Sequence, residues 1–345
     1  MKKKTGMSLV ALVVVLFALF FLLTLPVTYE VEPDGNYKKA KASGIKRPFH
    51  VDRNEYPFAS NWLEYNGAAM HYLDEGEGTP VVLCHGNPTW SFLYRNVIKG
   101  LDGQARLIAP DLPGFGFSGA PENFDFRPES HSKYVNHFLL EELQLEKFIL
   151  VVQDWGGPIC LNIAASHPDK TVGIVISNTW AWPVEGRLAL ASNFIKTAPT
   201  QRVIINRNGL GHMLMDSMLP EMDNREAVLR AYSHAFPTPE SRLPTAKFPV
   251  EINGSAEWLA GIESRLPTLK GKPVQFIFGM ADRETMSEYN IGKWKSLFPD
   301  AEVQVVDHAK HFTQEDTPES YVTAISWLLK TVGGLEAAET ETSAE

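Results

Sequence analysis

Residues 147–160 read KFILVVQDWGGPIC, and this stretch decides the fold. The apolar run that ends at Gln153 predicts a strand buried on both faces, and the following Asp154, Trp155 and two glycines predict a sharp turn into a helix. An ionised carboxylate directly after a buried strand is costly unless it is paired or used. Asp154 is therefore a candidate nucleophile, placed at a strand-to-helix elbow where many hydrolases carry a serine. The alternative is that Asp154 only caps the helix.

Strands and helices alternate on both sides of this stretch. Strands are expected at residues 61–67, 68–76, 80–86, 105–111, 147–153, 171–178, 272–282 and 301–312. The first two form a hairpin because Asn66-Gly67 is a strong turn signal between alternating apolar residues. The others are separated by helical patterns, which predicts an α/β fold with a mainly parallel sheet and right-handed crossovers.

The alternation stops at Asn178 and resumes near residue 270. The insertion at residues 179–269 is too long for a plain loop and is expected to form a helical cap over the sheet. The core then comprises residues 58–178 and 270–331. Residues 28–57 are polar and aperiodic and are expected to be a linker, and the acidic residues 332–345 are expected to be a disordered tail.

The N-terminus carries a long apolar run. Three lysines precede residues 7–27, which contain no charged side chain and are long enough to cross a bilayer as a helix. A cleaved signal peptide is the alternative, but its apolar region is usually shorter and ends at small residues. The lysines predict that residues 1–6 are cytoplasmic, that the helix is an uncleaved membrane anchor, and that the catalytic domain is extracytoplasmic, either periplasmic or on the cell surface.

Composition excludes several classes of protein. The formal net charge of −9 and the absence of a basic stripe argue against a nucleic-acid partner. The two cysteines, Cys84 and Cys160, cannot form a metal quartet. Both lie in apolar contexts, and we expect buried thiols rather than a disulfide.

Three further groups follow strands at the same edge of the predicted sheet as Asp154. Asn87 comes after the strand at 80–86 and offers a side-chain amide and a backbone N–H, although an Asn-Pro turn would also explain it. Asp282 follows the strand that reads FIFG. His311 follows the last strand, with His308 as the competing histidine. A nucleophile, an acid and a base at successive strand ends predict a catalytic triad.

These residues lie in motifs that resemble those of the haloalkane dehalogenases of the α/β-hydrolase fold. The segments HGNPTWSFLYRN (85–96), DLPGFGFS (111–118), VVQDWGGP (151–158) and HFTQEDTP (311–318) are similar to that family's signatures in order and spacing, and the resemblance runs from Asn61 to Lys330. It implies an eight-stranded sheet with the cap inserted after the sixth strand. One group of the family has its acid where this chain has Asn178, so the acid is expected at Asp282. The pattern of an Asp-His-Asp triad with Asn and Trp is similar to the family's third subgroup.

The resemblance also implies a mechanism without metal or organic cofactor. Asp154 displaces halide from a small apolar substrate to form an ester, Asn87 and Trp155 stabilise the halide, and His311 activates the water that cleaves the ester. The backbone N–H groups of Asn87 and Trp155 are expected to form the oxyanion hole.

Two other functions remain open at this point. An epoxide hydrolase would need acidic groups, usually two cap tyrosines, but the cap contains only Tyr232. A membrane-tethered protein of the same fold that binds a ligand without turnover is the other possibility. Six cap residues are candidates either to line a substrate pocket or to pack in the core: Trp180, Trp182, Trp258, Met213, Met215 and Met218.

Overall fold

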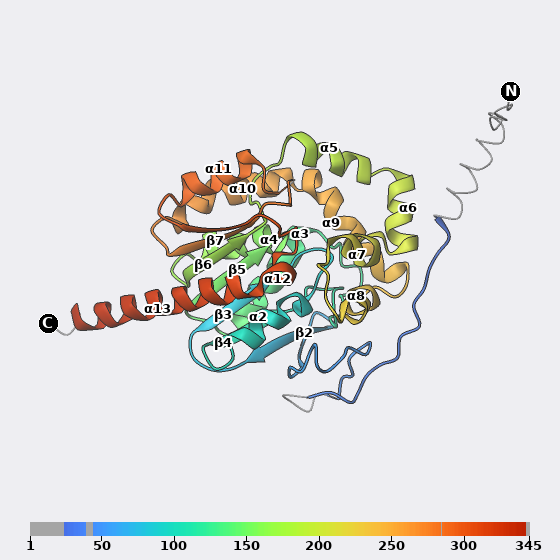
Figure 1. Cartoon of the computed structure of the whole chain (residues 1–345), viewed down its shortest axis with the longest axis horizontal. Coiled ribbons are helices and arrows are strands. Elements are labelled where there is room, and N and C mark those ends of the chain that lie inside the picture. The colour runs from blue at the N-terminus through green and yellow to red at the C-terminus, as the bar shows by residue number, and fades with distance from the viewer. Residues whose placement is uncertain (1–23, 39–43, 284, 343–345) are drawn as a thin grey trace, which may run out of the picture.

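An eight-stranded sheet forms the centre of the computed structural model, which describes residues 24–38, 44–283 and 285–342 (Figure 1). The strand order is β1-β2-β4-β3-β5-β6-β7-β8. β2 pairs antiparallel with β1 and with β4, and all the other pairs are parallel. The strands are β1 Asn61–Tyr65, β2 Ala68–Glu75, β3 Pro80–Cys84, β4 Arg106–Pro110, β5 Phe148–Gln153, β6 Thr171–Ser177, β7 Val274–Gly279 and β8 Glu302–Val306. The predicted α/β-hydrolase fold and the hairpin at Asn66-Gly67 are confirmed.

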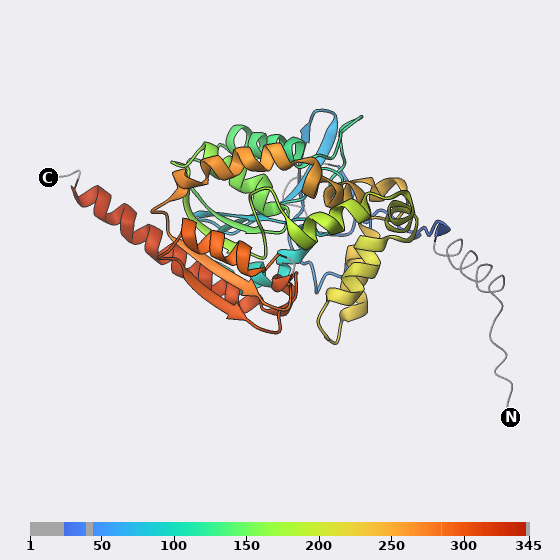
Figure 2. The same ribbon diagram turned by 90° about the horizontal axis from the view of Figure 1, so that it is seen from above.

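Helices cover both faces of the sheet (Figures 1 and 2). On one face α13 packs against α2, β6 and β7, and on the other α4 packs against α3, α10 and β5. Every residue of β5 is buried as a result, which explains why that strand is apolar along its whole length. The elements of this core are η1 Ser91–Tyr94, α2 Arg95–Gly100, α3 Pro128–His137, η2 Phe138–Glu142, α4 Gly156–Ser166, α11 Glu288–Leu297, α12 Thr313–Asp316 and α13 Pro318–Thr342.

The segment between β6 and β7 is helical. It contains α5 Gly186–Ile195, α6 Ala198–Arg207, η3 Gly209–Leu214, α7 Met215–Met218, α8 Arg225–His234, η4 Glu240–Arg242, α9 Leu243–Gly254, α10 Ala256–Arg265 and η5 Leu266–Leu269. Trp180, Trp182 and Met215 are fully buried in the core, Trp258 and Met218 pack against it, and Met213 is exposed. Packing is therefore the main role of these cap side chains.

The residues ahead of β1 do not form the expected linker. Tyr37, Phe49 and Tyr56 are buried, and Arg47 is only 1% exposed. The Arg47 guanidinium lies over the rings of Tyr37 and Tyr56 and donates to Ser60 Oγ at 2.9 Å. The sequence did not predict this packing, because the side chains that pack are isolated aromatic rings and one cation within a polar, aperiodic stretch.

The prediction of a membrane-anchored, extracytoplasmic protein is corrected by the structure. Within the part of the chain that the structure describes, no helix is both long enough and apolar enough to cross a bilayer. Most of the predicted span at residues 7–27 lies outside the described residues, and its described end runs along the cap instead. Val27 N–H donates to the Asn206 carbonyl at 2.7 Å, and Tyr29 N–H donates to the Pro237 carbonyl at 2.9 Å.

Two smaller expectations are also wrong. Cys84 and Cys160, expected as thiols, form a disulfide with their Cα atoms 6.9 Å apart, because α4 packs directly on β3. The tail expected to be disordered continues α13 as a helix to Thr342. Its alanines and glutamates are strong helix formers, which outweighs the low apolar content of the segment.

Candidate active site

Asp154 occupies a strained turn between β5 and α4. Its φ of 49° lies in the left-handed region that non-glycine residues rarely adopt, as expected for a nucleophile elbow. A side chain at Gly157 would overlap Thr179 Oγ1, and one at Gly156 would overlap the Cys84 carbonyl. Glycines at both positions therefore let the turn form without displacing these neighbours. The Asp154 side chain does not cap α4, whose N-cap residue is Trp155. The carboxylate is directed instead at the groups that face it across the end of the sheet.

The structure brings the three predicted triad residues together at the carboxyl ends of β5, β7 and β8. His311 Nε2 lies 3.2 Å from Asp154 Oδ2, and His311 Nδ1 lies 2.7 Å from Asp282 Oδ2. The His311 carbonyl accepts from Gln153 Nε2 at 2.9 Å, which fixes the backbone of the histidine to the end of β5. The competing His308 is exposed to solvent.

The two carboxylates and the imidazole are electrostatically coupled. Burial opposes ionisation of Asp282, but the charge and hydrogen bond of His311, aided by Thr285, lower its pKa from 3.8 to about 2. Burial also disfavours the charged imidazole, but the carboxylates of Asp282 and Asp154 outweigh it and raise the pKa of His311 from 6.5 to about 10. Both carboxylates therefore favour the protonated form of the imidazole that lies between them.

Two residues that the sequence did not single out as site residues hold Asp282. Asn178 Nδ2 donates to Asp282 Oδ2 at 3.1 Å, and Asn178 Oδ1 accepts from Gly279 N–H at 2.9 Å. The Thr285 hydroxyl donates to the same carboxylate. The sequence analysis mentioned Asn178 only because this position lacks the acid found in one group of the family. In the structure its side-chain amide holds Asp282, which follows the neighbouring strand β7.

Asn87 and Trp155 lie beside Asp154. The backbone N–H of Asn87 donates to Asp154 Oδ1 at 2.7 Å, and its side-chain amide donates to the Thr245 carbonyl of the cap at 3.3 Å. That bond uses one of the two amide hydrogens and leaves the other for a ligand. The buried Trp155 ring packs between the rings of Trp180 and Phe248, at centroid distances of 5.1 and 5.3 Å.

Gly86 makes the close approach of the two loops possible. A Cβ at this position would lie 2.3 Å from Asp154 Oδ1 and 2.7 Å from Trp155 N, closer than such atoms normally approach. Glycine at position 86 therefore lets the loop that carries Asn87 reach the elbow without displacing it.

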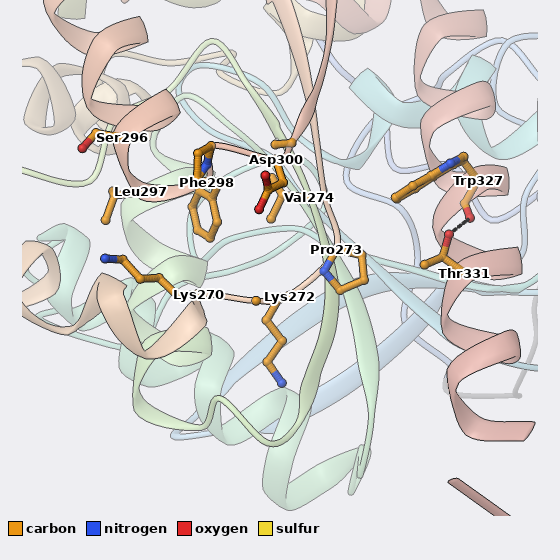
Figure 3. A pocket seen from close by; sticks show the side chains of 13 residues that line it. Lys270, Lys272, Pro273, Val274, Ser296, Leu297, Phe298, Asp300, Trp327 and Thr331 are labelled. Carbon is orange, nitrogen blue, oxygen red and sulfur yellow. Dashed lines mark hydrogen bonds between the residues drawn. The ribbon is translucent and has the colours of Figure 1, made fainter. Parts of the chain in front are cut away.

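A cavity of about 450 Å³ lies elsewhere, at the start of β7 (Figure 3). Its lining includes Lys270, Lys272, Phe298 and Trp327. Asp282 follows the other end of the same strand, so this cavity is separate from the triad. Among the residues that the structure describes, no group of three or more His, Cys, Asp or Glu side chains could hold a metal ion.

Comparisons with known proteins show which proteins this chain resembles. The family model described as the α/β hydrolase fold matches residues 79–318. A curated relative from Mycobacterium tuberculosis, named haloalkane dehalogenase 2, is 36% identical over 282 residues, which cover 80% of this chain and 97% of that protein. A protein from Shewanella oneidensis named cis-3-alkyl-4-alkyloxetan-2-one decarboxylase is 29% identical over 280 residues, covering 78% of this chain and 87% of that protein.

The fold is also similar to that of solved structures. The crystal structure of a haloalkane dehalogenase from Bradyrhizobium elkani superposes with a TM-score of 0.72. It is 23% identical and covers 81% of this chain and 99% of the other, a likeness that concerns the fold alone.

Proposed function

The chain belongs to the α/β hydrolases and, within them, to the haloalkane dehalogenases, and we propose that Asp154 is its nucleophile. The protein is a hydrolase that acts on carbon–halogen bonds. The observation that carries the proposed roles is the placement of Asp154 on a left-handed elbow, with His311 Nε2 at 3.2 Å from its carboxylate. A carboxylate is ionised at neutral pH and needs no base to attack, which suits displacement at a saturated carbon.

In the first step an oxygen of Asp154 attacks the carbon that bears the halogen. The new carbon–oxygen bond forms as the carbon–halogen bond breaks, and the halide leaves with the electron pair. The free amide hydrogen of Asn87 and the indole N–H of Trp155 donate to the departing halide. The result is an alkyl ester of Asp154.

In the second step His311 removes a proton from water, and the resulting hydroxide attacks the ester carbonyl of Asp154. Formation of the ester makes His311 a better base for this step. Once Asp154 is esterified it carries no charge, so one of the two carboxylates that raise the pKa of His311 is lost and the imidazole gives up its proton more easily. Asp282 holds Nδ1 in its protonated form and stabilises the imidazolium that forms. The ester then releases the alcohol, and the halide and a proton leave the site.

The alternatives receive less support from the site. Epoxide opening needs a hydroxyl directed at the substrate, but the only cap tyrosine, Tyr232, is fully buried and donates to Glu315. A protein that binds a ligand without turnover has no need of an acid, a base and a nucleophile at hydrogen-bonding distance. The halogenated substrate is therefore the one that these residues are best arranged to process.

The test measures bromide released from 1-bromobutane by the full-length protein, its Asp154→Ala variant and its His311→Phe variant. We expect steady release from the unchanged protein and none from Asp154→Ala. His311→Phe should release one bromide per active site and retain the alkyl group on Asp154, detected by intact mass and peptide mapping. Finding no ester in that variant would exclude the proposed route.

Two further substrates separate the competing reactions. An epoxide tests for diol formation, and a cis-3-alkyl-4-alkyloxetan-2-one tests for the reaction that the Shewanella relative's name describes. A saturated ring carbon in either molecule is also open to attack by a carboxylate. Turnover of one of these in preference to the bromoalkane would replace the proposed substrate class.

A further inference from the structure

The loop that carries His311 is held by the cap on both sides. This base loop, residues 307–316, contains Lys310 directly before the histidine and Glu315 four residues after it. Lys310 Nζ donates to the Ser217 carbonyl of α7 at 2.9 Å. Glu315 accepts from the hydroxyl of Tyr232 in α8. The base is thus flanked by one exposed and one buried contact to the cap.

The buried contact is part of a larger charged cluster. Arg95 Nη1 and Nη2 donate to the two oxygens of Glu315 at 2.5 and 2.8 Å, and Arg95 Nε donates to Glu55 at 3.2 Å. Glu55 in turn accepts from Asn224, which immediately precedes α8. Arg95 and Glu315 have side chains that are only 1% exposed, so solvent does not screen this pair.

Tyr232 is the cap residue at the centre of this cluster. Its side chain is fully buried, and its ring lies edge-on to Phe92 at a centroid distance of 5.3 Å. Burial and the charge of Glu315 raise the pKa of Tyr232 well above 10, so its hydroxyl stays protonated and donates. Phe92 and Arg95 both follow the loop of Asn87 in the chain. The cluster therefore joins the cap, the segment after the Asn87 loop and the base loop.

We infer that Tyr232 is a positioning residue, which couples the placement of the cap to the position of His311 through Glu315. This inference rests on the proposed roles of Asp154 and His311. It predicts that the two steps of the reaction depend differently on the contact between Tyr232 and Glu315. The first step uses Asp154, which is fixed by the core turn between β5 and α4, and halide donors that contact the cap at Thr245 and Phe248 of α9. The second uses His311, whose loop Tyr232 of α8 restrains through Glu315. Loosening the cap contact therefore slows ester hydrolysis more than ester formation.

The experiment follows bromide by rapid quench in the full-length Tyr232→Phe variant. The change removes one hydroxyl. The ring still packs against Phe92, and the ion pair of Arg95 and Glu315 is retained. We expect the bromide burst to keep its rate within about twofold, while steady release falls by about tenfold or more, because small misplacements of a catalytic group cost up to about a hundredfold. Intact mass should show alkyl ester accumulating during turnover.

The matched control is Tyr134→Phe, which removes a tyrosine hydroxyl that donates to the Tyr65 carbonyl at 2.5 Å, away from the cap. It should lower the melting temperature without any accumulation of ester. A merely structural role for Tyr232 predicts the same behaviour in both variants, and that result would overturn the inference. Should Tyr232→Phe fail to fold, Lys310→Met removes the exposed cap contact of the same loop and should shift the balance of the two steps in the same direction.

The His311→Phe variant distinguishes a failure of the proposed function from a failure of the positioning role of Tyr232. If that variant retains no ester, the proposed function itself is wrong. If it retains ester but neither Tyr232→Phe nor Lys310→Met accumulates it, only the positioning role of the cap contact is refuted.

Discussion

Replacing Asp282 by asparagine should separate the two chemical steps. In the structure Asp282 Oδ2 accepts from His311 Nδ1 at 2.7 Å, from Asn178 Nδ2 at 3.1 Å and from the Thr285 hydroxyl. In Asp282→Asn the carbonyl oxygen can take the place of Oδ2 and accept from all three donors, but it carries no negative charge. The imidazolium that forms when His311 takes the proton of water then lacks the carboxylate that stabilises it.

The size of the effect follows from the loss of this charge. Removing one partner of a buried ion pair costs about 3–5 kcal/mol, which at about 1.36 kcal/mol per tenfold change lowers turnover by more than about a hundredfold. This loss falls on ester hydrolysis. Ester formation depends on Asp154 and on the N–H donors of Asn87 and Trp155, none of which contacts Asp282, so its rate should change far less. The variant should therefore stop after one turnover with the alkyl group on Asp154.

The assay combines rapid-quench measurement of bromide with intact mass after addition of 1-bromobutane. The expected result is a burst that approaches one bromide per active site, followed by very slow release. Asp74→Asn is a suitable control, since it removes a carboxylate that pairs with Arg106 at 2.8 Å far from the triad. Steady release by Asp282→Asn within tenfold of the unchanged protein would refute the orienting role of this carboxylate.

Three other predictions test separate parts of the site. Gly86→Ala should lower unfolding stability by about 1–3 kcal/mol and reduce turnover by about a hundredfold, because the added methyl would overlap Asp154 and Trp155; thermal melts and steady-state rates test both effects. Trp155→Phe keeps an aromatic ring but removes one N–H donor, so ester formation should slow by about a hundredfold and inhibition by added bromide should weaken, as burst kinetics can measure. Stability should also depend on pH. The lowered pKa of Asp282 stabilises the fold above pH 3.8, and this stabilisation is lost as the pH falls to about 2. The raised pKa of His311 stabilises the fold fully below pH 6.5, and that stabilisation is lost as the pH rises to about 10. Melting temperatures of the unchanged protein should follow both slopes, and an alkaline slope that persists unchanged in His311→Phe would contradict the assignment.

The sheet and the grouping of the three triad residues could be predicted from the sequence. Alternating apolar runs and punctuating glycines specify parallel strands, and the carboxyl ends of parallel strands meet at one edge. That rule was sufficient to predict that Asp154, Asp282 and His311 lie close together. His311 was chosen over His308 in the same segment, and the structure leaves His308 exposed to solvent.

The contacts that support the site could not be predicted in this way. Asn178 and Thr285 act on Asp282 through spatial proximity, and no periodic pattern encodes that contact. The packing of Tyr37, Arg47 and Tyr56 within the predicted linker, residues 28–57, was missed for another reason. A polar composition is typical of a linker, and one buried cation among aromatic rings leaves no period.

The buried Arg47 bears on where this chain can be shortened. The family match begins at residue 79, yet a version of the protein that started there would lack β1, β2 and Arg47, and it would leave β4 without a neighbour on one side. An unpaired strand of this kind recruits other chains, so such a fragment should aggregate when produced. Limited proteolysis should accordingly leave a resistant piece that still contains Arg47, and engineering of this enzyme should preserve its N-terminal boundary ahead of that residue.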